Sequence, residues 1–309
     1  MDAPIDLTRL REWVGRSQTV RDIATEAKSH TLAATLDYDA DPWGGQLFPL
    51  AHWTHFNPTE PQRALDVDGH PHLGGFLPPV PLPRRMWAGS DLTFHRPISV
   101  GQQLQDVQTV TDVTARTDRS GQLVFVTVTH EISADDNPAI TDRHTIVYRE
   151  AATAETEPAP AESPAERAAH EPADTSAWDY SQVTRPDETM LFRYSALTFN
   201  AHRIHYDRGF CIDDEGYPGL VVHGPLLATL MSDAFQRHRP GEQIRAFSFS
   251  ARRPVFDGTP VAAVGRQTTA SATEVAILDP AGHACLIGTI DHRTTGGHRR
   301  PLPKGAAHV

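Results

Sequence analysis

The sequence contains few cysteines and no long apolar run. Its two cysteines, Cys211 and Cys285, are too few for a disulfide framework, which excludes the small disulfide-stapled domains, and we expect both to be free thiols. No run approaches the ~20 apolar residues of a membrane-spanning helix. Asp2, Asp6 and Arg9 interrupt the N-terminal stretch in which a signal peptide needs apolar residues. The sequence therefore predicts a cytoplasmic protein with no membrane partner.

Lysine is nearly absent too. Lys28 and Lys304 are the only lysines among 28 basic residues, so the rest are arginines. The formal net charge of −11 argues against a general nucleic-acid-binding protein, because a phosphate backbone needs a basic face. Any anion site in this chain must therefore be built from arginine side chains, helix termini or histidines.

The length of 309 residues is sufficient for two domains, each with its own core. Residues 153–175 are rich in Ala, Glu and Pro and contain no large apolar residue, so we expect an extended linker there. This linker would join an N-terminal domain over residues 1–152 to a C-terminal domain over 176–295. Residues 296–309 are rich in Gly, His, Arg and Pro and are expected to form a flexible tail.

The two halves share a pattern of turns. Each has an Arg-Pro pair with a glycine four residues after the proline, and then a second glycine-containing turn before a β-rich run: Arg96-Pro97 with Gly101 and 118–121, and Arg253-Pro254 with Gly258 and 279–282. The two matches lie at nearly the same separation along the chain. We therefore expect a duplicated fold.

Hydrophobic periodicity predicts an α+β fold in each half. The expected helices cover 7–14, 26–36 and 225–237, and the expected strands cover 92–95, 103–114, 122–132, 144–149, 190–197, 244–251, 261–269, 274–278 and 284–292. The helix over 225–237 is the clearest, since its apolar residues recur at three- and four-residue spacing and Pro225 suits its first position.

Two segments of the second half carry the candidate chemistry. Asn200, His202 and His205 follow an apolar run, which places a base beside a polar partner. About fifteen residues later, His223-Gly224-Pro225 leads into the helix over 225–237. Backbone N–H groups at a helix start have no partner in the helix and can receive a developing negative charge. Together the segments indicate addition or removal of water at an activated acyl group.

These segments resemble the MaoC-like hydratases of the hot-dog fold. Residues 198–205 are in register with that family's Ser-Gly-Asp-x-Asn-Pro-x-His loop, and 222–224 match its Val-His-Gly segment. Residues 74–87 resemble the degenerate N-terminal domain of two-domain hydroxyacyl-thioester dehydratases. The resemblance implies a double hot-dog with one active site, in the C-terminal domain. It also implies a CoA-thioester substrate, short, methyl-branched and dicarboxylic, of the mesaconyl-C4-CoA or itaconyl-CoA type.

The resemblance also implies catalytic roles. His205 is at the position of the catalytic histidine, and Asn200 replaces the usual aspartate. Because an amide cannot take a proton, we expect Asn200 to orient water while His205 moves the proton; alternatively, Asn200 only stabilises the loop. Gly224, and the N–H of Leu226, would bind the thioester oxygen, although an ordinary helix entry has the same sequence. His223 would line the pocket.

Arginines are the candidates for binding substrate anions. Arg203 replaces the family's proline and either binds a substrate carboxylate or forms an ion pair with Asp207. Arg193 is a weaker candidate of the same kind. Tyr206 is expected near the substrate, chiefly as a packing residue. Further candidates, for the CoA phosphates or else as a charged strand edge, are Arg252 and Arg253.

We expect no metal and no cofactor other than the CoA of the substrate. His202, His205 and Asp207 lack the His-Glu-x-x-His spacing of a zinc site. Two other functions remain open, because the fold alone does not decide between them: an acyl-CoA thioesterase and a non-catalytic acyl-CoA-binding protein. A chain with two hot-dogs would be a pseudo-dimer, either monomeric or paired as a homodimer.

Overall fold

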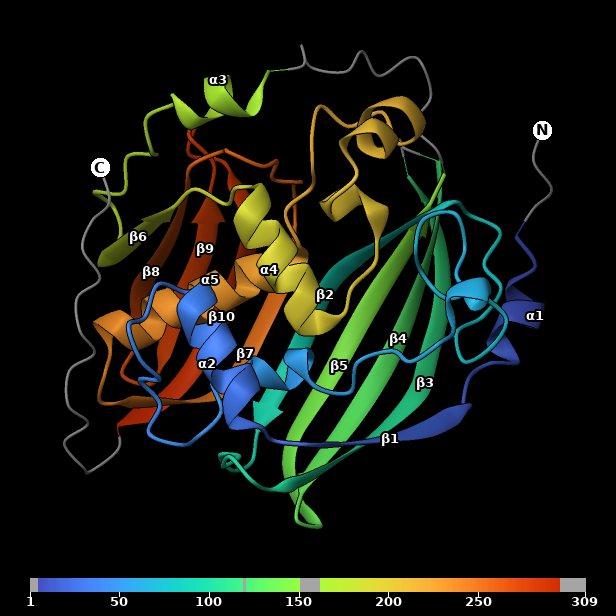
Figure 1. Ribbon diagram of the computed structural model, residues 1–309, viewed down its shortest axis with the longest axis horizontal. Helices are drawn as coiled ribbons and strands as arrows, with labels where there is room; N and C mark the ends of the chain where they lie inside the picture. The colour runs from blue at the N-terminus through green and yellow to red at the C-terminus, as the bar shows by residue number, and fades with distance from the viewer. Residues whose placement is uncertain (1–4, 119–120, 151–161, 295–309) are drawn as a thin grey trace.

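The computed structural model describes residues 5–118, 121–150 and 162–294, and its centre is one ten-stranded antiparallel sheet (Figure 1). The strand order is β1-β3-β4-β5-β2-β7-β10-β9-β8-β6. The first-half strands are β1 Ser17–Ile23, β2 Arg84–Phe94, β3 Gln103–Asp118, β4 Gly121–Ala134 and β5 Asn137–Arg149. Those of the second half are β6 Tyr180–Thr184, β7 Glu242–Ala251, β8 Val261–Thr269, β9 Ala272–Leu278 and β10 Ala284–Thr294.

Five strands from each half meet along β2 and β7. Read outward from this junction, both halves have the same pairing, β2-β5-β4-β3-β1 and β7-β10-β9-β8-β6. Gly89 is directly opposite Ser250 at the junction, and a Cβ atom at Gly89 would overlap the carbonyl oxygen of Phe249. Only glycine lets the two strands approach this closely. The duplicated α+β fold is thus confirmed in its strand order.

The helices gather on one face of the sheet (Figure 1). The α-helices are α1 Leu7–Arg11, α2 Glu26–Thr35, α3 Pro164–Ala168, α4 Glu188–Thr198 and α5 Gly224–His238. The short turns are η1 Ala51–Thr54, η2 Gln62–Ala64, η3 Arg203–His205 and the π-type η4 Phe210–Asp214. No described helix is long and apolar enough to cross a membrane.

The predicted helix over 225–237 is confirmed as α5, which is almost wholly buried and contacts β7 to β10. The corresponding stretch of the first half, between α2 and β2, is different. Its described residues form loops and the short turns η1 and η2. Since no long helix fills the concave face of β2 to β5, space remains between the sheet and these loops.

The predicted strand over 190–197 is wrong, because this segment lies within α4. The side chain of Asp187 caps the helix by accepting a hydrogen bond from the N–H of Met190 (2.8 Å). Leu191, Tyr194 and Ser195 are buried on one face, at the three- and four-residue spacing of a helix. The short apolar run concealed this period. Strands β1 and β6 were not predicted, since both are short and partly exposed.

The expected extended linker is wrong in its described part, residues 162–175. Ser163 and Glu166 form a capping box at the start of α3, and Arg167 is buried. Its guanidinium forms an ion pair with the fully buried Asp257 (2.9 Å). A single arginine thus fixes a segment that lacks apolar residues. Residues 153–161 and the predicted tail over 296–309 lie outside the described residues.

Candidate active site

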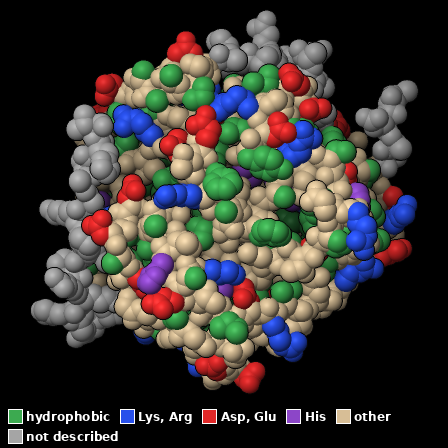
Figure 2. Space-filling view, viewed as in Figure 1, with side chains coloured by type: hydrophobic (Ala, Val, Ile, Leu, Met, Phe, Trp, Pro, Cys, Tyr) green, Lys and Arg blue, Asp and Glu red, His purple; other side chains and the backbone are tan. Residues whose placement is uncertain are grey.

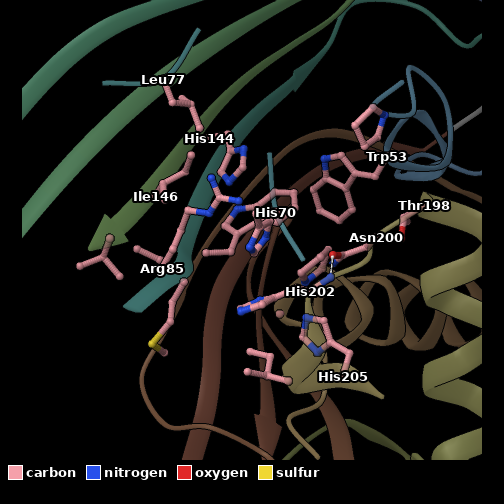
Figure 3. A pocket seen from close by; sticks show the side chains of 18 of the residues that line it. Trp53, His70, Leu77, Arg85, His144, Ile146, Thr198, Asn200, His202 and His205 are labelled. Atoms are coloured by element: carbon pink, nitrogen blue, oxygen red, sulfur yellow. Dashed lines mark hydrogen bonds between the residues drawn. The ribbon is translucent and has the colours of Figure 1, made fainter. Parts of the chain in front are cut away.

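A cavity of about 1000 Å³ lies between the two halves (Figure 3). The second half contributes the loop after α4 and the N-terminus of α5. The first half contributes β2 to β5 and the loop before β2. On the face shown in Figure 2, acidic and basic side chains are interspersed around hydrophobic ones, so no large field of one sign covers it. The predicted patch of the first half is confirmed as a wall of the cavity by His52, Trp53, His55 and Phe56.

His205 has the geometry of a base. It is buried in η3 at the cavity wall, and its Nδ1 lies 2.7 Å from the carbonyl oxygen of Val221. Since a carbonyl only accepts, Nδ1 carries the hydrogen and Nε2 keeps its lone pair. Burial lowers the pKa of His205 to about 4, with the Val221 hydrogen bond acting in the opposite direction. The ring is therefore neutral at pH 7 and able to take a proton.

His223 supports His205 from behind. The two rings stack at 3.6 Å, and His223 Nε2 lies 2.8 Å from Ser195 Oγ. His223 is fully buried and does not line the cavity, so its predicted place in the substrate pocket is wrong. As the residue before α5, it joins the helix start to the catalytic ring.

Asn200 faces the cavity from the turn that ends α4. Phe199 adopts a left-handed conformation (φ 48°), and Asn200 Oδ1 accepts a hydrogen bond from the N–H of His202 (3.0 Å). This contact stabilises the loop, as one of the two sequence hypotheses stated. Its role toward water stays a prediction.

Gly224 and Pro225 bring the start of α5 to the cavity. First-turn N–H groups have no acceptor within the helix, and the helix dipole favours negative charge there. The side chain of Leu226 points into the core and does not line the cavity. Any contribution of Leu226 is therefore limited to its backbone N–H.

The predicted carboxylate site at Arg203 is wrong. Its guanidinium forms a double hydrogen bond with Asp207 Oδ2 (2.7 and 3.0 Å), the alternative left open by the sequence. Arg193 is exposed and donates to the carbonyl of Ala34, and Tyr206 is 51% exposed. None of these three predicted residues lines the cavity.

Several other arginines do line it. Arg252 and Arg253 lie at the exposed end of β7, where CoA phosphates would leave the cavity, and their predicted role stays a prediction. The sequence gave no signal for the first-half arginines Arg85, Arg116 and Arg149, which also line the wall. Arg85 forms no ion pair with any described carboxylate, and Figure 3 shows it on the same wall as the catalytic loop.

The sequence also missed a cluster formed by both halves. Asp68 Oδ2 lies 3.0 Å from His70 Nδ1, and the His70 ring contacts the His202 ring at 4.1 Å. The ring of His202 lies 5.4 Å from that of His205. Figure 3 shows the three histidines one after another. Asp68 and His70 escaped notice because their loop matches no motif in the second half.

Electrostatics favour neutral rings in this cluster. Burial, together with the charge of Arg85, lowers the pKa of His70, and burial lowers that of His202. Burial acts to raise the pKa of Asp68, but the hydrogen bond from His70 outweighs it and the pKa is lowered. Donor atoms of Asp68, His70 and His202 lie within 4.8 Å of one another, so these residues could also hold a metal ion.

Comparisons with known proteins agree with this geometry. The profile of the family named hydroxyacyl-thioester dehydratase type 2 matches residues 50–257. The mesaconyl-C(4)-CoA hydratase of Chloroflexus aurantiacus is 40% identical over 281 residues, covering 90% of this chain and 96% of the relative. The mitochondrial hydroxyacyl-thioester dehydratase type 2 of Schizosaccharomyces pombe is 27% identical, covering 78% and 87%.

Solved structures confirm the fold. A MaoC-like dehydratase from Phytophthora capsici superposes with a TM-score of 0.64 at 13% identity, covering 94% of this chain and all of that one. A second MaoC-like dehydratase gives 0.65 at 17% identity, covering 93% and 100%. The predicted double hot-dog architecture is confirmed.

Proposed function

Because the chain belongs to the hydroxyacyl-thioester dehydratase type 2 family, we propose that it reversibly adds water to an α,β-unsaturated acyl-CoA thioester. One observation carries the proposal: the hydrogen bond from His205 Nδ1 to Val221 leaves a neutral Nε2 in the cavity wall, which also holds the start of α5. The cavity therefore combines a base with a site for negative charge, as this reaction requires.

In the proposed mechanism, the thioester oxygen binds at the N–H of Gly224, which polarises the conjugated double bond. His205 Nε2 takes a proton from a water molecule held by the Asn200 side chain. The hydroxide oxygen bonds to the β-carbon as the double-bond electrons move toward the thioester, and the resulting enolate is stabilised at the start of α5. Protonation of the α-carbon completes the hydration. The scheme uses no cofactor beyond the CoA of the substrate.

The proposed substrate is a short methyl-branched dicarboxylic thioester of the mesaconyl-C4-CoA or itaconyl-CoA type. The 40% identity to a mesaconyl-C(4)-CoA hydratase supports this choice. Arg85 supports it independently, because a guanidinium without a carboxylate partner among the described residues lines the same cavity as His205. An arginine in such a place suits a substrate carboxylate.

The test compares the wild type with His205→Ala on mesaconyl-C4-CoA, itaconyl-CoA and crotonyl-CoA, following enoyl absorbance and free thiol together. Loss of the enoyl signal without thiol release, abolished in the variant, is the expected result. Thiol release would instead identify a thioesterase. If the wild type binds these thioesters and turns none over, the chain is an acyl-CoA-binding protein.

We also propose that the chain is a cytoplasmic pseudo-dimer, because β2 and β7 already join two hot-dogs within one sheet. Light scattering would distinguish a monomer from a homodimer, and cell fractionation would test the location.

A further inference from the structure

The proposed mechanism lacks a second proton-transferring group, because Asn200 stands where a carboxylate would serve. We propose that the first half supplies this group: His70, oriented by Asp68, delivers the proton to the α-carbon. This inference rests on the proposed hydratase function and deepens it, since the active site would then need chemistry from both halves.

The loop that carries His70 is fastened directly to the catalytic loop. The N–H of Arg203 donates to the carbonyl of Asp68 (2.9 Å), and its guanidinium donates to the carbonyl of Val67 (3.0 Å). Gly69 has a φ of +88°, and a Cβ atom there would overlap the carbonyl oxygen of Ala201. The first-half loop can therefore approach this closely only with glycine. Arg203 thus joins the two loops rather than binding substrate.

Asp68 fixes both the position and the tautomer of His70. One carboxylate oxygen accepts from the backbone N–H of His70 (2.8 Å), and the other lies 3.0 Å from Nδ1. Since an ionised carboxylate only accepts, Nδ1 carries the hydrogen and Nε2 keeps its lone pair. The negative charge of Asp68 would stabilise the imidazolium when Nε2 takes a proton. This is the arrangement in which a carboxylate orients a catalytic histidine.

The positions of the three histidines allow one proton to travel from water to the α-carbon. His205 takes it from the attacking water, and it passes by way of His202, whose ring lies between the other two. On His70 the proton is stabilised by Asp68, and Nε2 then gives it to the α-carbon as the enolate collapses. Both His205 and His70 begin and end neutral, so the cycle needs no external acid.

A metal ion held by Asp68, His70 and His202 is the competing interpretation. The separation of 3.0 Å between Asp68 Oδ2 and His70 Nδ1 is that of a hydrogen bond, and the two rings are in contact at 4.1 Å. Zinc would need the three donor atoms turned toward one point ~2.0–2.2 Å away. The geometry therefore favours the dyad.

The decisive experiment measures kcat and KM of the full-length His70→Gln variant on the best thioester found for the wild type. We expect kcat to fall at least ~100-fold with KM within about threefold, because general acid–base catalysis contributes ~10²–10⁴-fold. Asp68→Asn should lose about tenfold, since it disturbs only the orientation. His72→Gln is the matched control: His72 is exposed on the same loop beside Asp66 and should retain activity within about twofold.

Chemical rescue separates proton transfer from a structural role. Added imidazole should restore His70→Ala at least tenfold and leave Asp68→Asn unchanged, whereas a merely structural histidine would show no rescue. Full activity in His70→Gln would overturn the inference while leaving the hydratase function intact. Failure of the wild type to hydrate any thioester would overturn the function first. Inhibition of the wild type by a chelator, reversed by zinc, would replace the dyad with a metal site.

Discussion

The two halves of the molecule use one strand order and cover it differently. In the second half α5 lies across the sheet, its start faces the cavity, and His205 lies nearby. In the first half, loops and the short turns η1 and η2 replace that helix, and the cavity occupies the remaining space. A duplicated fold can thus divide one task, with the helix-bearing half supplying the charge site and the other half supplying room and a wall.

The first prediction tests whether the chemistry depends on the helix-bearing half. His205→Gln should lower kcat/KM by ~10²–10⁴-fold, because it removes the base, whereas His144→Gln should cost less than about tenfold. His144 lines the same cavity from β5 and stacks on Trp87 at 3.8 Å. Steady-state kinetics on one thioester would measure both. Equal losses would show that the two halves share the chemistry evenly.

The second prediction concerns the repeated turn, where Val100 precedes Gly101 and Asp257 precedes Gly258. Val100 packs against the apolar core, while Asp257 is fully buried and paired with Arg167 and Arg208. Asp257→Ala should lower the free energy of unfolding by ~3–5 kcal/mol, because it leaves the buried Arg167 without its partner.

Urea denaturation measures this loss of stability. The exposed pair of Arg266 and Glu274 provides the control, and Glu274→Ala should cost less than ~1 kcal/mol. A similar loss in both variants would mean that the buried pair contributes no more than a surface pair.

The third prediction addresses selectivity, which we assign to the first-half wall. Arg85→Gln should lower kcat/KM for mesaconyl-C4-CoA by about tenfold to a hundredfold, the equivalent of one charge-assisted hydrogen bond of ~1.5–3 kcal/mol. Crotonyl-CoA has no free carboxylate and should be affected less than about twofold. Arg143→Gln, on the exposed side of β5, is the control. An equal loss on both thioesters would show that Arg85 does not recognise the carboxylate.

How far the sequence predicts this comparison depends on locality. The helix α5 and the loop at His205 could be predicted because their signals lie within a few residues of each other. Asp68 and His70 could not, since only the fold brings their loop onto Ala201 and Arg203. Arg203 shows the same limit: the sequence offered Asp207 and a substrate carboxylate equally, and its third contact, Val67, lies far away in the chain.

The last prediction uses titration to separate the halves. Burial lowers the folded-state pKa of His205 to about 4, so its neutral form contributes stability that is complete above pH ~6.5 and falls as the pH drops toward 4. In the first half Asp106 lies 2.8 Å from His130 and raises its pKa despite burial. That histidine contributes stability at low pH, which is lost as the pH rises through its folded-state pKa.

The two variants His205→Gln and His130→Gln should therefore change the pH dependence of unfolding in opposite directions. Relative to the wild type, His205→Gln should lose less stability between pH 6.5 and 5, by at most about 1.4 kcal/mol per pH unit, and His130→Gln should lose more. Urea denaturation of the three proteins at pH 5, 6.5 and 8 measures the difference. A shift of the same sign in both variants would contradict the assignment of an uncharged cluster to the catalytic loop and a charged pair to the first-half sheet.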